Sequence, residues 1–174
     1  MLARIDPHKA VGLISCLFKD SVEQHLNFIK KMTDHSADQY LYVTKLLDIK
    51  NDEAKQIMTE YTLTSKDPAM AKLWLQILNT ELELTCQNEP DRVVEKVKRN
   101  LKQNFYPAEE CLKVCHKHQM KEACAILCKK IGRYKESVQF YIESCSEGID
   151  IAALKKELHG LDRLIRVTLL KQKK

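Results

Sequence analysis

The chain has 174 residues, of which 44% are apolar and 30% are charged, and its formal net charge is +5. Its four glycines and four prolines are too few for the tight turns of a β-sandwich or barrel, and its many helix-forming residues favour an all-α fold. The apolar fraction excludes a disordered chain, and no apolar run approaches the ~20 residues of a membrane-spanning helix, so we expect a soluble, cytoplasmic protein.

Prolines and polar clusters divide the sequence into short segments of helical periodicity. Proline is favoured in the first helical turn, so Pro7, Pro68, Pro90 and Pro107 predict helix starts. Ser21 with Gln24 has the form of a capping box. Apolar residues at helical spacing predict helices over 7–18, from Ser21 to before His35, over 37–47, from Asn51 onward and over 69–86. Further along the chain, the same spacing predicts helices over 91–104, after Pro107, from near Met120 to Gly132, from near Tyr134 onward, and over 151–158 and 161–170.

About eleven short helices with short connections predict antiparallel neighbours. A helix pair recurs roughly every 30 residues, which is typical of a solenoid, in which each hairpin buries its apolar face against the next. We therefore expect residues 1–174 to form one α-solenoid of stacked antiparallel hairpins, a segment of a longer chain. A closed multi-helix bundle is the alternative. Trp74 lies within the apolar stripe of 69–86, and we expect it in the core rather than at an interface.

A more specific pattern covers residues 107–144. Its positions are Leu112, Cys115 and His118, then Lys121, Glu122 and Ala123, then Leu127, Gly132, Tyr134, Ser137 and Tyr141. This segment resembles the clathrin heavy-chain repeat, which is found in clathrin and in subunits of the HOPS and CORVET vesicle-tethering complexes. The stretches 25–29 and 39–46 are similar to a paired-helix segment of the vacuolar tethering subunits. Whole family members also carry a β-propeller and a zinc-binding RING domain, so we expect an excised middle or C-terminal segment.

The resemblance implies a non-enzymatic scaffold and protein-interaction segment of a tethering or coat subunit in endosome-to-lysosome or vacuole transport. It implies a cytoplasmic protein, peripheral on these membranes, whose partners are other tethering or coat subunits and small GTPases. A tetratricopeptide-like adaptor for protein assembly outside trafficking is the alternative, because its repeat of about 34 residues uses similar hairpins.

Positive charge is concentrated in the middle of the chain. Residues 91–135 carry a net charge of +7, whereas residues 1–90 carry −3. Such a band is either a solvated helical face or a docking surface for an acidic partner. The candidate partner-binding residues are Arg92, Lys96, Arg99, Lys102, Lys129, Lys130 and Arg133.

We expect no nucleic-acid partner, because the nearby aromatics fall at repeat-packing positions rather than among the basic residues. The basic, amphipathic segment 161–174 fits either membrane contact or the open end of a repeat array.

Seven cysteines raise the question of a metal site. Cys111 with Cys115, and Cys124 with Cys128, are spaced by four residues, which places each pair on one helix face among apolar positions. Structural zinc sites favour a two-residue gap on a tight turn, so we expect core packing. A Cys/His metal-binding module, with the two pairs facing each other, is the less favoured alternative. The remaining cysteines, Cys16, Cys86 and Cys145, are predicted to be buried thiols.

The sequence predicts no catalytic, cofactor-binding or metal-ligating residues. Cys115 and His116 are adjacent in a helix, so their side chains diverge and do not form a nucleophile–base pair. All four glycines are solitary, so no glycine-rich loop is available to bind phosphate.

Overall fold

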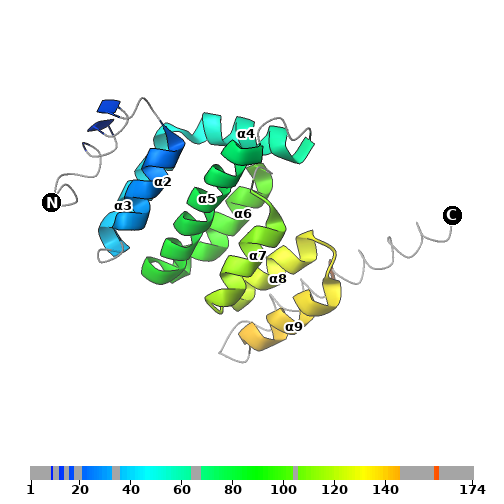
Figure 1. Cartoon of the computed structure of the whole chain (residues 1–174). Helices are drawn as coiled ribbons and strands as arrows, with labels where there is room; N and C mark the ends of the chain where they lie inside the picture. The colour runs from blue at the N-terminus through cyan, green and yellow to red at the C-terminus, as the bar shows by residue number, and fades with distance from the viewer. Residues whose placement is uncertain are drawn as a thin grey trace. The chain divides into compact units, whose positions relative to one another are not determined.

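The computed structural model describes residues 9, 12, 13, 16, 17, 21–32, 36–63, 68–103, 106–145, 159 and 160. Within these ranges every regular element is helical, with eight α-helices and one 3-10 helix (Figure 1). The all-α prediction is confirmed. The chain divides into a first unit, Met1–Pro107, and a second unit, Ala108–Lys174.

The first unit is organised around one long helix. Its elements are α2 (Val22–Lys31), α3 (Ser36–Ile49), α4 (Asn51–Leu63), α5 (Pro68–Asn88), the 3-10 helix η2 (Pro90–Arg92) and α6 (Val93–Gln103). Helix α5 contacts α2, α3, α4, η2 and α6. It is therefore the element on which the rest of this unit packs.

The residues of α5 explain its central position. Trp74, Ile77, Leu78 and Leu82 recur at helical spacing, and each is at most 2% exposed. Trp74 is fully buried, which confirms that it belongs to the core. Proline at the first position begins this helix, as the sequence predicts.

The second unit consists of α7 (Ala108–Lys117), α8 (Lys121–Lys130) and α9 (Tyr134–Cys145) among its described residues. Helix α8 packs against both α7 and α9. Ala123 and Ala125 are fully buried on α8, and such small side chains let neighbouring helices approach closely. The Ser137 hydroxyl on α9 donates a hydrogen bond to the Ala125 carbonyl at 2.8 Å, which fixes the hairpin of α8 and α9.

Two helices of the second unit end in the same backbone motif. After α8, Gly132 has φ +83°, the Gly132 N–H donates to the Lys129 carbonyl, and the Arg133 N–H donates to the Cys128 carbonyl. After α7, Gln119 has φ 58°, and the Gln119 and Met120 N–H groups donate to the His116 and Cys115 carbonyls. Both ends are Schellman motifs, which place one residue in the left-handed region that favours glycine.

Opposite stability changes are expected at these two helix ends. Gly132→Ala should lower the free energy of unfolding by about 1–2 kcal/mol, because alanine is strained at positive φ. Nothing lies within 4 Å of an added Cβ there, so the cost is conformational rather than steric. Gln119→Gly should raise the free energy of unfolding by about 0.5–1 kcal/mol. Thermal unfolding followed by circular dichroism checks both, and a lower melting temperature for Gln119→Gly would contradict the motif.

Three local predictions need correction. Ser21 occupies the N-cap of α2, but its side chain makes no capping hydrogen bond, so the capping box is not formed. The sequence pattern predicts Val93, Val94, Val97 and Leu101 as the inward residues of α6. Val93 and Val97 are buried, but Val94 and Leu101 are only half-buried, and Lys96 and Asn100 are buried as well. Cys16 is exposed rather than buried.

Some predictions fall on parts of the chain that the structure does not describe. These are most of the predicted helix over 7–18, the helices over 151–158 and 161–170, and the burial of Cys145. Among the helices that it does describe, none has both the length and the apolar character required to cross a bilayer.

Candidate functional site

The first unit contains a polar groove between α3, α5 and the η2–α6 segment. Its main hollow has a volume of about 380 Å³. A smaller hollow of about 120 Å³ shares Asp48, Glu81 and Arg99 with it. We call the two together the polar groove. Its polar lining residues are Tyr40, Thr44, Asp48, Asn51, Glu81, Thr85, Glu89, Arg92, Glu95, Lys96, Arg99, Asn100 and Gln103.

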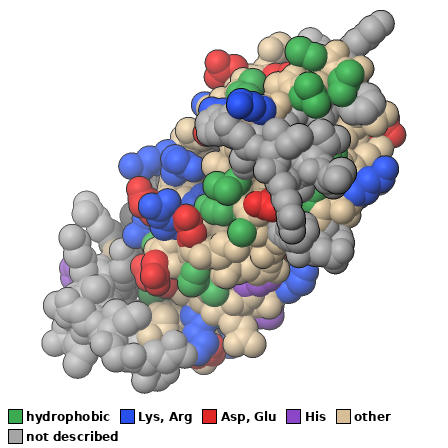
Figure 2. All heavy atoms as spheres, turned by 90° about the vertical axis from the view of Figure 1, so that its left-hand side faces the viewer, with side chains coloured by type: hydrophobic (Ala, Val, Ile, Leu, Met, Phe, Trp, Pro, Cys, Tyr) green, Lys and Arg blue, Asp and Glu red, His purple; other side chains and the backbone are tan. Residues whose placement is uncertain are grey.

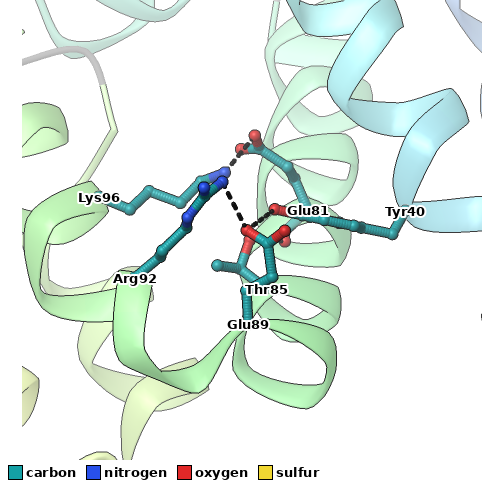
Figure 3. A network of polar contacts seen from close by, with 6 residues as sticks. All are labelled: Tyr40, Glu81, Thr85, Glu89, Arg92 and Lys96. Atoms are coloured by element: carbon teal, nitrogen blue, oxygen red, sulfur yellow. Dashed lines mark hydrogen bonds and ion pairs between the residues drawn. The ribbon is translucent and has the colours of Figure 1, made fainter. Parts of the chain in front are cut away.

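A buried ion pair joins α5 and α6 in this groove. Lys96 and Glu81 form a salt bridge, and each side chain is only 9% exposed (Figure 3). Removing a charge from water is costly, and the opposite charge offsets that cost only while both partners are present. The two helices are therefore coupled through this pair.

A second network lies beside the first, around Glu89. Arg92 contacts the Glu89 carboxylate at 3.0 Å, and the Tyr40 hydroxyl of α3 donates to the same oxygen at 3.1 Å (Figure 3). Burial, together with the hydrogen bond to Glu89, raises the pKa of Tyr40, which favours the protonated phenol that donates this hydrogen bond. The Thr85 hydroxyl donates to the Glu81 carbonyl at 2.7 Å. The contacts around Glu89 link α3, α5 and η2.

Other polar groups of the groove have no such partner. The Thr44 Oγ1 and Asn100 Nδ2 atoms are buried, and neither has a hydrogen-bond partner in the described part of the chain. Asn100 is 6% exposed as a residue. Arg99 and Asp48 line both hollows from opposite helices, and no ion pair joins them. The groove thus offers both donors and acceptors to a ligand.

Three of the basic residues that the sequence suggests as partner-binding lie at this site. Arg92, Lys96 and Arg99 line the groove, and Lys102 is exposed near the end of α6. However, Lys96 pairs with Glu81 of α5, and Arg92 pairs with Glu89, the residue that precedes η2, so they do not form a free cationic stripe.

Sequence reasoning missed the acidic side of the groove. Glu81 and Thr85 are four residues apart on one face of α5, and Glu89 follows four residues later, just beyond the end of that helix. This polar stripe interrupts the apolar pattern of the helix. The interruption of the apolar pattern could have indicated that the basic residues of α6 pair with acidic residues of the same chain.

The second basic cluster lies in the second unit. Lys130 is exposed and Lys129 is half-buried. Arg133 pairs with Glu136, with Nε and Oε1 2.6 Å apart, and this hydrogen bond raises the pKa of Arg133. On the face drawn in Figure 2, basic and acidic side chains lie next to one another in several places.

Arg133 and Glu136 also border a hollow of about 390 Å³ between α7, α9 and the α8–α9 turn. Its apolar lining residues are Leu112, Ile131 and Phe140. The His116 ring meets the Phe140 ring edge-on, with centroids 5.8 Å apart.

The cysteines of α7 and α8 are core residues. Cys111, Cys115, Cys124 and Cys128 are each at most 1% exposed, as their spacing predicts. Burial raises the pKa of the Cys128 thiol, which favours its neutral form. Within the described ranges, no three His, Cys, Asp or Glu side chains are grouped so that they could hold a metal ion.

Comparison of the chain with protein-family models, with curated proteins and with solved structures finds no match.

Proposed function

We propose that this chain is a non-enzymatic protein-binding scaffold, a segment of a vesicle tethering or coat subunit in endosome-to-lysosome or vacuole transport. Its partners are other subunits of that complex and small GTPases, and it is peripheral to the membrane through the complex. The observation that carries the proposal is the packing of α7, α8 and α9, whose core contains Leu112, Cys115, Ala123, Leu127, Ser137 and Tyr141 from the segment that resembles the clathrin heavy-chain repeat.

Those repeat residues occupy the positions that such hairpins require. Leu112 and Cys115 of α7, Ala123 and Leu127 of α8, and Tyr141 of α9 are at most 9% exposed. Gly132 makes the left-handed step between the last two helices. A hairpin of this kind cannot bury both of its faces alone, so stacking on further hairpins follows from its physics. We propose that both units are parts of such a stack.

The proposed mechanism is physical rather than chemical. Stacked hairpins provide a long surface on which partners dock, while charged residues steer the encounter and set its orientation. Arg99, Lys102 and Lys130 are the exposed basic residues of the candidate set for which the structure gives no ion pair among its described residues. In this proposal an acidic partner is attracted by these three exposed residues and not by Lys96, which is buried.

Capture from a cell lysate, with the tagged whole chain as bait and at low and high salt, tests this function. The expected result is enrichment of tethering or coat subunits or of endosomal GTPases. Capture of unrelated assembly machinery alone would favour a tetratricopeptide-like adaptor. About one zinc per purified chain would favour a metal-binding module.

Charge reversal of exposed basic residues is expected to weaken capture. The double variant Lys102→Glu, Lys130→Glu should lower the recovered partner several-fold at low salt and flatten its salt dependence, because rim charges act mainly on the encounter. Lys72→Glu, at another exposed lysine, is the matched control and should leave recovery unchanged. If the double variant and Lys72→Glu recover equal amounts of the partner, Lys102 and Lys130 do not belong to the docking surface.

A further inference from the structure

We propose that the polar groove binds an extended segment of a partner polypeptide and recognises its backbone. This inference rests on the proposed function, because it names how one partner is held. Three features carry it, namely the length of the groove, the internal pairing of its charges, and the donors and acceptors that remain.

The length of the groove suits a short extended peptide. Its lining residues run from Leu78 on α5 to Glu89, which directly follows the end of that helix, with α3 and α6 on either side. Eleven residue steps of an α-helix span about 16 Å. An extended chain advances about 3.3 Å per residue, so about five residues lie along the groove.

The charges of the groove do not select a strongly charged ligand. Lys96 and Arg92 are paired with Glu81 and Glu89. Arg99, Asp48 and Glu95 are charged rim residues that have no ion pair within the described part of the chain, and they are of mixed sign. A polyanion or a polycation would meet repulsion from one side of the groove, because like charges brought together oppose binding.

The remaining polar groups match a peptide backbone. Asn100 Nδ2 and Arg99 are donors, Asp48 is an acceptor, and Thr44 Oγ1 serves as either. A peptide backbone presents N–H and C=O groups in alternation, so one strand supplies a partner for each. A buried amide without an acceptor is unfavourable, so a carbonyl that enters the groove gains a hydrogen bond that the chain itself does not supply.

The probe is a peptide selected for its binding to the whole chain. It is selected from a phage-displayed library of random linear nine-residue peptides. Peptides that survive are synthesised, and fluorescence anisotropy measures their dissociation constants. Asn100→Leu and Thr44→Val remove the two unpartnered groups with little change in shape. We expect each to weaken binding about tenfold without lowering the melting temperature. Arg99→Ala should also weaken binding, whereas Lys98→Ala, at an exposed neighbour outside the groove, should not.

Backbone N-methylation of the selected peptide tests the recognition mode directly. Removing one N–H that faces the groove should weaken binding about tenfold, whereas a peptide held only by its side chains would tolerate the change. Absence of any selected peptide, or equal binding to wild type, Asn100→Leu and Thr44→Val, would show that the groove holds only water and would overturn the proposal. The selection uses no cellular partner, so its failure leaves the lysate result standing, and failure of the lysate capture leaves the peptide result standing.

Discussion

Replacing Lys96 with methionine, with Glu81 left in place, should lower the free energy of unfolding by about 3–5 kcal/mol. The Glu81 side chain is 9% exposed and its charge is balanced by Lys96. Without that partner, its carboxylate must either stay charged away from water or take up a proton, and both are unfavourable. Urea unfolding followed by Trp74 fluorescence measures the change, because the single tryptophan lies in the same unit.

The companion variants of this experiment separate the ion pair from general effects of substitution. The double variant Lys96→Met, Glu81→Leu should recover most of the lost stability, because it leaves no unpaired buried charge. Lys98→Met, at an exposed site on the same helix, should change stability by no more than about 0.5 kcal/mol. If Lys96→Met behaves like Lys98→Met, the pair does not hold α5 against α6.

Truncation of Trp74 to alanine is expected to have an effect of similar size, about 3–5 kcal/mol of destabilisation. Trp74 is fully buried on α5, the helix that contacts every other described helix of its unit. The truncation removes apolar contacts and leaves a cavity that rigid helices fill only partly. Circular dichroism during urea unfolding measures the loss, since this variant has no tryptophan.

Phenylalanine at the same position distinguishes packing from hydrogen bonding. The indole Nε1 of Trp74 is buried and has no hydrogen-bond partner among the described residues. Trp74→Phe therefore sacrifices only part of the packing and no hydrogen bond, so it should cost clearly less than Trp74→Ala. Leu41→Ala, at a side chain that is 52% exposed, serves as the surface control and should stay within about 0.5 kcal/mol of wild type. Equal losses for the phenylalanine and alanine variants would mean that the indole is not held by its packing.

Within the ranges that the structure describes, the sequence by itself determined where the helices lie. Helical periodicity, proline at a first turn and glycine after a last turn act over a few residues, so they could be recognised without a fold. Helix α5 begins at Pro68, and α8 ends before Gly132, as their local chemistry predicts. The burial of Trp74 and of the four cysteines on α7 and α8 followed from the same periodicity.

The candidate site was only partly contained in the sequence. The spacing of Arg92, Lys96 and Arg99 predicted a basic stripe, because residues four and three apart share a helix face, but it did not predict the groove that they line. Arg92 and Glu89 are only three residues apart, but the pairing of Lys96 with Glu81 could not be read from the local sequence. Lys96 and Glu81 are 15 residues apart in the chain and meet only because α6 packs beside α5.

Tertiary structure alone decided which face of α6 is buried and where the chain divides. Val94 and Leu101 suit an inward position by hydrophobicity, yet Lys96 and Asn100 are more buried, because α5 offers a carboxylate and the groove encloses the amide. The local sequence pattern indicates only how much free energy it costs to bury each residue. Whether that cost is offset depends on the side chains of the helix that packs opposite. For the same reason, the division into Met1–Pro107 and Ala108–Lys174 depends on contacts between helices, which no local pattern contains.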